Sequence, residues 1–84
     1  MKNKILVELE IPLIEREFDL FLPINKKIGT IKNLIEEELV ELTEGAYEKV
    51  DSTNLYSKET GTIYDVNKTL RDTDLKNGSR IILI

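Results

Sequence analysis

The sequence predicts an α+β fold whose elements follow the order ββαββ, a short turn and a final strand, within one domain spanning residues 1–84. Three observations support this prediction. Two stretches near the N-terminus alternate apolar and polar residues, as half-buried strands do. The middle of the chain repeats apolar residues at helical spacing. Residues 81–84 are all aliphatic, which favours a strand covered on both faces or one that leaves a contact surface.

The first two strands are expected at residues 5–11 and 18–22. Each is followed by a proline, which cannot donate to the hydrogen-bond ladder of a sheet. Because a short connection joins them, we expect them to pair as a hairpin. Leu13 and Ile14 lie in the connection 12–16, where they either fold back on the core or form an exposed contact.

The helix is expected to begin with Thr30 as its N-cap and to end with Gly45 in the left-handed conformation at the C′ position. Glu38 falls within the apolar arc, so we expect it at the edge of the apolar stripe or paired with a basic residue. The apolar stripe consists of Ile31, Leu34, Ile35, Leu39 and Leu42. The opposite face, interpreted as solvated, carries Glu36, Glu37, Glu41 and Glu44.

After the helix, the sequence predicts two short strands at residues 53–57 and 62–64, separated by a four-residue turn. Thr69 or Asp72 can cap a single helical turn. Asn77-Gly78 is a turn signal directly before the final strand, because both residues tolerate a positive φ.

The sequence contains no cysteine and no histidine, and its formal net charge is -4 at pH 7. Thiol nucleophiles, thiolate metal sites and imidazole bases are therefore excluded, and the negative charge disfavours nucleic-acid binding. An enzyme that used helix carboxylates such as Glu36, Glu38 and Glu41 would need two groups with separated pKa values in a cleft. We expect no enzymatic activity, no catalytic residue, no cofactor and no metal site.

No segment approaches the roughly 18 apolar residues of a membrane span. The apolar run near the N-terminus is interrupted by Glu8 and Glu10, which is not the pattern of a signal peptide. We expect a cytoplasmic protein that does not insert directly into a membrane. Docking to a membrane protein would leave no such mark in the sequence.

The end of the chain resembles the end of ubiquitin through Thr69-Leu70, Leu75, and Ile81 with Leu83. Thr30-Ile31 at the start of the helix fits the same pattern. The resemblance implies a ubiquitin-like β-grasp fold, in which a mixed sheet of four to five strands packs on one α-helix. It also implies that the last strand lies in the middle of the sheet, parallel to the first.

Within ubiquitin-like proteins, Phe18-Asp19-Leu20 and Asn77-Gly78-Ser79-Arg80-Ile81 resemble the YukD-like group, which is associated with type VII secretion in Gram-positive bacteria. The resemblance implies a non-catalytic interaction module that acts as an accessory component of type VII secretion, with a protein partner such as a membrane secretion subunit. The alternative is a relative of ubiquitin-like modifiers or sulfur carriers that has lost its C-terminal Gly-Gly and is a structural or self-associating domain. The sequence ends in Leu83-Ile84, so conjugation or thiocarboxylate chemistry is not expected.

Ubiquitin-like folds commonly bind partners with the exposed face of the sheet, which the resemblance places at Tyr56, Ile82 and Ile84. If Ile81 and Leu83 face the helix, alternation directs Ile82 and Ile84 outward. Five residues should then form an exposed apolar surface for protein binding: Leu6, Phe21, Tyr56, Ile82 and Ile84. Alternatively, loop 12–16 or the loop after the helix folds over that face. A homodimer through the exposed sheet face would also satisfy the pattern.

Overall fold

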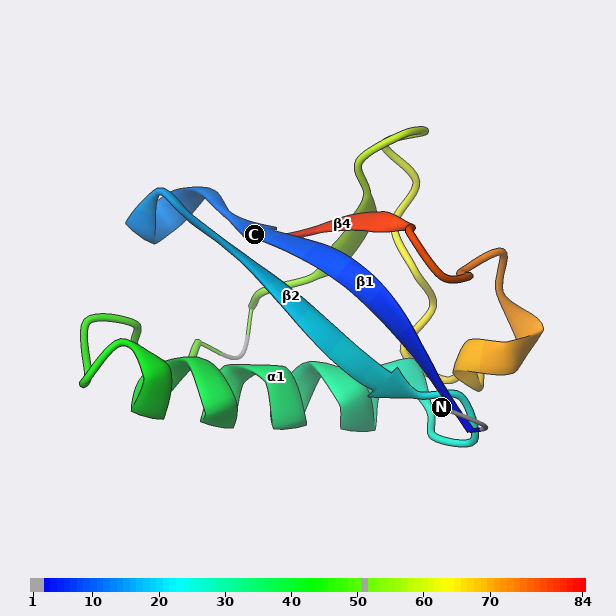
Figure 1. Cartoon of the computed structure of the whole chain (residues 1–84), viewed down its shortest axis with the longest axis horizontal. Coiled ribbons are helices and arrows are strands. Elements are labelled where there is room, and N and C mark those ends of the chain that lie inside the picture. The colour runs from blue at the N-terminus through cyan, green and yellow to red at the C-terminus, as the bar shows by residue number, and fades with distance from the viewer. Residues whose placement is uncertain (1–2, 51) are drawn as a thin grey trace.

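The computed structural model describes residues 3–50 and 52–84 and contains a mixed four-stranded sheet packed on one helix (Figure 1). The sheet has the order β2-β1-β4-β3; β1 is antiparallel to β2 and parallel to β4, and β4 is antiparallel to β3. The predicted place of the final strand beside the first is thus confirmed. The elements are β1 (Lys4–Ile11), β2 (Arg16–Pro23), α1 (Ile28–Leu42), β3 (Leu55–Ser57) and β4 (Arg80–Leu83).

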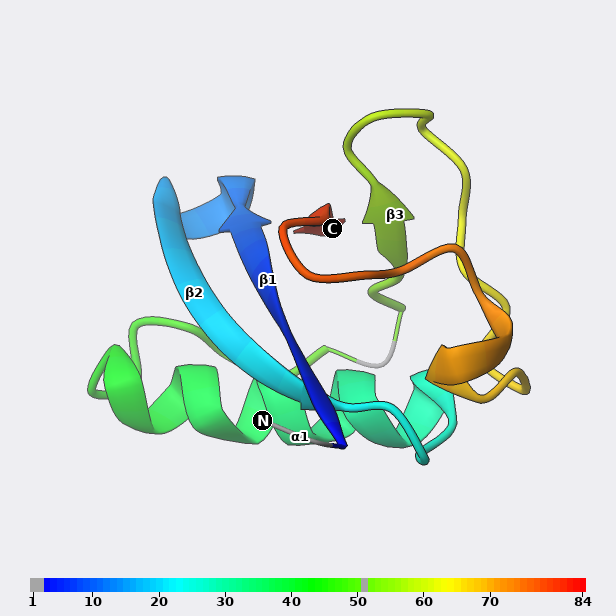
Figure 2. The ribbon, with the colours of Figure 1, turned by 45° about the vertical axis from the view of Figure 1, so that its right-hand side comes forward.

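Among residues 3–50 and 52–84, α1 covers one face of the sheet and no helix covers the other (Figures 1 and 2). Successive side chains of a strand point to opposite faces of the sheet. On the face covered by α1, Val7, Leu9 and Ile11 of β1 and Ile81 and Leu83 of β4 are therefore buried. The largest apolar side chains of the core come from all four strands, the helix and two loops. They include Val7, Leu9, Ile11, Leu22, Ile31, Ile35, Leu39, Tyr47, Leu55, Leu70, Ile81 and Leu83.

The strand predicted at residues 62–64 is reduced to a single bridge between Tyr56 and Ile63. Two hydrogen bonds hold this segment to β3: Ser57 N–H donates to Thr62 O at 2.9 Å, and Tyr64 N–H donates to Leu55 O at 2.9 Å. The chain then leaves the sheet toward the start of α1, and this departure stops the ladder after one bridge.

The prediction of Thr30 as the N-cap is wrong, because α1 begins at Ile28 with Lys27 in the cap position. Lys27 makes no side-chain capping bond. The free N–H groups at the start of the helix are satisfied by a distant loop instead. Ile28 N–H donates to Lys68 O at 2.8 Å, and Gly29 N–H donates to Val66 O at 2.9 Å.

Helix α1 ends one residue earlier than predicted. Gly45 N–H donates to Val40 O at 2.9 Å and Glu44 N–H donates to Glu41 O at 3.1 Å, which is the Schellman pattern. The C′ position therefore belongs to Glu44, whose φ is 51°, rather than to Gly45. Gly45 follows it, also with a positive φ of 85°.

The predicted faces of α1 need correction. Glu36 was placed on the solvated face but is 1% exposed, whereas Leu34 and Leu42 were placed in the apolar stripe but are 48% and 47% exposed. The loop after the helix causes the difference, because it folds over Glu36 and buries that side of α1. Glu38 is exposed beside the apolar face, as one of its two expected positions requires.

Two predicted turns are present. The connection of the first hairpin is a single helical turn, Pro12–Ile14, in which Leu13 is exposed and Ile14 packs against the core. In the Asn77-Gly78 turn, Gly78 has a φ of 89°. The turn is hydrogen-bonded to β1: Asn77 Oδ1 accepts from the Leu6 N–H at 2.8 Å, and the Gly78 N–H donates to Leu6 O at 2.8 Å. The turn thereby sets the position of β4 beside β1.

Near the end of the chain, the expected single helical turn spans Leu70–Asp72. Thr69 occupies the N-cap position of this turn but makes no side-chain capping bond.

Candidate protein-binding surface

The face of the sheet opposite α1, called the outer sheet face, carries the five residues predicted to bind a partner. On β4, Ile81 and Leu83 are buried while Ile82 between them is half-buried on the other side. Ile84 continues the ladder by exchanging two hydrogen bonds with Asn54, at 2.7 and 3.1 Å. All five predicted residues keep solvent exposure: 39% for Leu6, 51% for Phe21 and 62% for Ile84, with Tyr56 and Ile82 partly exposed.

The strand register divides four of these five residues into two pairs. Leu6 lies directly opposite Phe21 near one end of the β1–β2 pair. Tyr56 lies directly opposite Ile82, and Ile63 bridges to Tyr56 from the next segment. We call Tyr56, Ile63 and Ile82 the Tyr56 cluster. Ile84 lines a separate apolar hollow with Leu13, Tyr47 and Val50. The predicted single apolar surface is therefore two smaller ones on the same face.

Four carboxylates on β1 and β2 lie beside these apolar groups and form what we call the acidic row, and the register places one of them, Glu10, directly opposite Ile82. The register pairs Glu8 with Asp19 and Glu10 with Glu17 across β1 and β2. Like charges directly opposite each other destabilise a strand pair, so this arrangement needs compensation. On the other side of β1, the register brings Arg80 opposite Glu8.

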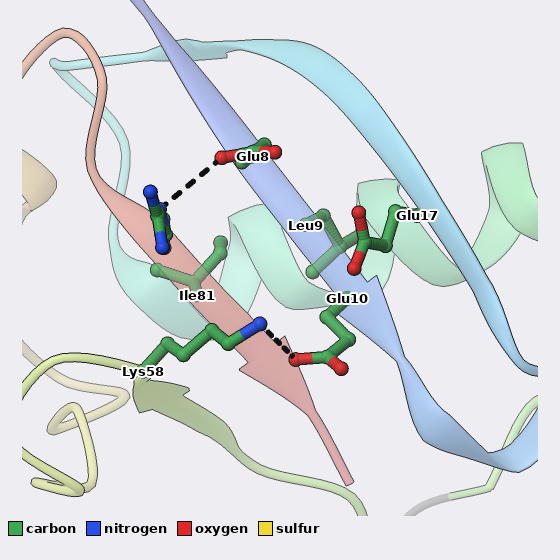
Figure 3. A pocket seen from close by; sticks show the side chains of 7 residues that line it. Glu8, Leu9, Glu10, Glu17, Lys58 and Ile81 are labelled. Atoms are coloured by element: carbon green, nitrogen blue, oxygen red, sulfur yellow. Dashed lines mark ion pairs between the residues drawn. The ribbon is translucent and has the colours of Figure 1, made fainter.

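Two cations compensate half of the acidic row, as Figure 3 shows. Arg80 Nε lies 3.4 Å from Glu8 Oε2, and Lys58 Nζ lies 3.0 Å from Glu10 Oε2. These side chains surround a shallow hollow whose floor is formed at Leu9 and Ile81. Within residues 3–50 and 52–84, neither Glu17 nor Asp19 has an ion-pair partner within 4.0 Å. The row thus keeps an excess of negative charge.

The buried Glu36 defines a second polar cluster, on the far side of α1. Its carboxylate accepts hydrogen bonds from the Tyr47 hydroxyl at 2.9 Å and from Val50 N–H at 3.2 Å, and Thr53 Oγ1 lies 3.2 Å away. Lys32 Nζ lies 3.9 Å from it and donates to Thr53 O at 2.7 Å. These bonds fasten the loop after α1 onto the helix.

Burial raises the pKa of the Tyr47 hydroxyl well above its ordinary value of 10.0, and the hydrogen bond to Glu36 and its negative charge raise it further. The hydroxyl therefore stays protonated and donates to the carboxylate. Burial likewise raises the pKa of Tyr64, with smaller effects from the nearby Asp74 and Glu59 carboxylates. The groups that contact the Glu36 carboxylate come from α1 and from the loop after it. We therefore assign Glu36 a structural role.

Sequence patterns identified the apolar residues of the outer sheet face but not the ion pairs that form on it. Glu8 and Asp19 share the outward parity of Leu6 and Phe21, and this alternation was visible in the sequence. The pairing of Lys58 and Arg80 with the row was not visible, because it depends on which strands are neighbours. Ile63 was missed as a member of the Tyr56 cluster because it was assigned to a separate strand.

Across the part of the chain that the structure describes, no three side chains of the types that ligate metals gather into a possible metal site. In the same residues, no helix has the length and apolar character needed to cross a membrane.

Comparisons with known proteins identify the fold. No protein-family model matches this sequence, and no curated protein sequence matches it significantly. Among solved structures, the EccD5 ubiquitin-like domain from Mycobacterium xenopi superposes with a TM-score of 0.78 at 14% identity, covering 96% of this chain and 92% of that one. The ubiquitin-like domain of the Mycobacterium tuberculosis type VII secretion system protein ECCD1 gives 0.73 at 18% identity, covering 96% and 97%.

A chain of the MycP5-free ESX-5 inner membrane complex gives a TM-score of 0.74 at 16% identity. The match covers 98% of the present chain but only 21% of that one, so the similar domain is about a fifth of a larger protein. At such identities the likeness shows the fold: this chain has the ubiquitin-like β-grasp fold, and it resembles ubiquitin-like domains of type VII secretion proteins.

Proposed function

We propose that this chain is a non-catalytic ubiquitin-like interaction module that binds a protein partner through its outer sheet face. The observation that carries the proposal is the set of exposed apolar side chains on a sheet face that no helix covers. The Tyr56 cluster would supply the apolar centre of the interface, and the acidic row its polar rim. The partner would then present apolar side chains beside lysines or arginines.

For the partner, we propose a subunit of a type VII secretion membrane complex, which this chain would meet in the cytoplasm. Two observations support this assignment. The short motifs around Phe18 and Asn77 resemble those of the YukD-like group. Similar ubiquitin-like domains belong to EccD proteins, and one lies within an inner membrane complex.

An affinity capture from host lysate tests both parts of the proposal. Wild type, Ile82→Asp and Leu42→Asp serve as baits against separate membrane and soluble fractions. Ile82 lies in the Tyr56 cluster, whereas Leu42 is an exposed leucine at the end of α1 and is the matched control. Recovery of a membrane secretion subunit by wild type and Leu42→Asp, but not by Ile82→Asp, would support the proposal.

Recovery of the same partner by all three baits would contradict the assignment to the outer sheet face. Recovery of a partner unrelated to secretion, sensitive to Ile82→Asp, would support the face and contradict the secretion role.

A further inference from the structure

The sheet has two edge strands, and in the part of the chain that the structure describes only β2 leaves a long edge open (Figures 1 and 2). β3 is three residues long, and the segment at 62–64 bonds to its outer side. β2 extends over eight residues, and within the described part of the chain it pairs only with β1. An open edge presents unpaired N–H and C=O groups that can pair with an added strand.

The strand register identifies the backbone groups at this open edge. Glu8 N–H donates, at 2.9 Å, to the carbonyl of the residue before β4. Successive residues of a strand direct their backbone groups to opposite edges, so Val7 directs its groups toward β2, where its register partner is Leu20. The neighbours of Leu20 alternate with it, so Asp19 and Phe21 direct their N–H and C=O groups to the open edge.

An apolar groove lies beside this edge, between β2 and α1. Its α1 wall includes Leu34, which is 48% exposed although it is a large aliphatic side chain. Two charged residues, Lys4 and Glu38, also line the groove. The side chains that form its surface include Leu20, Leu22, Ile31, Leu34 and Ile35. A strand added to β2 would direct every second side chain into this groove and the others to the outer sheet face.

We propose that the groove between β2 and α1 binds an extended segment of a partner protein in which aliphatic and basic side chains alternate, adding a fifth strand along β2. The aliphatic side chains would enter the groove against Leu34. The basic side chains would lie on the outer side beside Glu17 and Asp19, the two members of the acidic row without an ion pair among the described residues.

The same charges argue against a second copy of this chain as the occupant. If two β2 strands paired across a twofold axis at Phe18, Glu17 of each copy would lie opposite Asp19 of the other. Like charges at facing positions destabilise a strand pair, whereas lysine at those positions stabilises it. Charge complementarity therefore favours a basic segment.

A synthetic peptide tests the proposal directly. The probe is a nine-residue peptide of alternating valine and lysine, titrated into the full chain while amide NMR shifts are followed. We expect saturable binding with the largest shifts at the amides of β2, including Asp19 and Phe21. A peptide of the same composition, with its valines in one block and its lysines in another, should bind at least about tenfold more weakly, because it cannot direct the two kinds of side chain to opposite faces.

Two variants locate the site. Leu34→Asp should weaken binding by about tenfold, since it removes an apolar contact and places a carboxylate against valine side chains. Leu42→Asp is the matched control, because Leu42 is equally exposed on the same helix but lies outside the groove, and it should leave the affinity unchanged. Ile82→Asp should also leave it unchanged, which separates this groove from the Tyr56 cluster.

Four results would overturn the proposal: no binding of the alternating peptide at millimolar concentration, equal binding of the block peptide, equal losses in Leu34→Asp and Leu42→Asp, or shifts confined to the Tyr56 cluster. A concentration-dependent dimer whose shifts map to β2 would replace the basic segment with a second copy. Thermal unfolding of each variant checks that the loss of binding is not a loss of fold.

Discussion

Glu36 combines a charged side chain with nearly complete burial, and hydrogen-bond donors from the loop after α1 surround it. Replacing it by alanine would leave the Tyr47 hydroxyl and the Val50 N–H without this acceptor and would remove the negative charge beside Lys32. Breaking such a cluster from one side is costly, because the remaining polar groups stay desolvated.

We expect Glu36→Ala to lower the free energy of unfolding by about 3 kcal/mol, measured by urea titration. Glu37→Ala is the control: Glu37 is exposed and lies 4.0 Å from Lys49, so its loss should change stability by less than about 0.5 kcal/mol. Equal effects of the two substitutions would contradict the structural role of Glu36.

Tyr47 should make the free energy of unfolding depend on pH in the alkaline range. Its pKa is raised in the folded state above the unfolded value of 10.0, so the folded state holds the proton more tightly. The contribution is fully present below pH 10 and is lost as pH rises from there toward the folded-state pKa. Within that window, each unit by which the pH rises should lower the Tyr47 contribution to the free energy of unfolding by about 1.4 kcal/mol.

Urea titrations of wild type and Tyr47→Phe above and below pH 10 check this dependence. The phenylalanine variant should be less stable at neutral pH, because Glu36 loses a donor, and its stability should fall less steeply in alkali. Identical slopes for the two proteins would show that Tyr47 does not titrate abnormally.

At the scale of elements, the end of α1 has a residue poorly suited to its conformation. Glu44 adopts a φ of 51°, which a residue with a Cβ accepts at a cost that glycine avoids. We expect Glu44→Gly to raise the free energy of unfolding by about 0.5–1 kcal/mol. Glu44→Gln removes the negative charge near the helix C-terminus without the backbone effect, and it should raise the free energy of unfolding by only a few tenths of a kcal/mol. A destabilised Glu44→Gly would contradict the assignment of Glu44 to C′.

The elements also differ in how far the sequence could determine them. β1 and β4 were predicted with the correct faces, because a period of two assigns each side chain to one side. The face of α1 was misplaced, since a loop without periodicity covers Glu36 and leaves Leu34 and Leu42 outside. The N-terminus of α1 was misplaced for a similar reason: its capping partners, Val66 and Lys68, are distant in sequence.

For the candidate site, the sequence could predict which residues face outward but not which of them are neighbours. Ile82 and Tyr56 were correctly assigned to one face, and the register places them side by side. The carboxylates of the acidic row lie on β1 and β2, but its cations come from distant segments: Lys58 follows β3 and Arg80 begins β4. Such long-range alignment has no local signal in a single sequence.

At the scale of the whole molecule, charge opposes self-association through the outer sheet face. The chain has a formal net charge of -4, and a twofold contact would bring two acidic rows together. We expect sedimentation of a monomer at low and physiological salt. A dimer that strengthens as salt is lowered would contradict this expectation, because lower salt increases repulsion between like charges.

The central claim is that the Tyr56 cluster meets a protein partner, and site-specific photocrosslinking in host cells tests it most directly. Tyr56 is replaced by the photoreactive aromatic residue p-benzoylphenylalanine, and a second variant carries it at Leu42 on α1. We predict a discrete crosslinked protein from position 56 and none from position 42. A discrete adduct from position 42, with none from position 56, would contradict the claim that the outer sheet face is the interface.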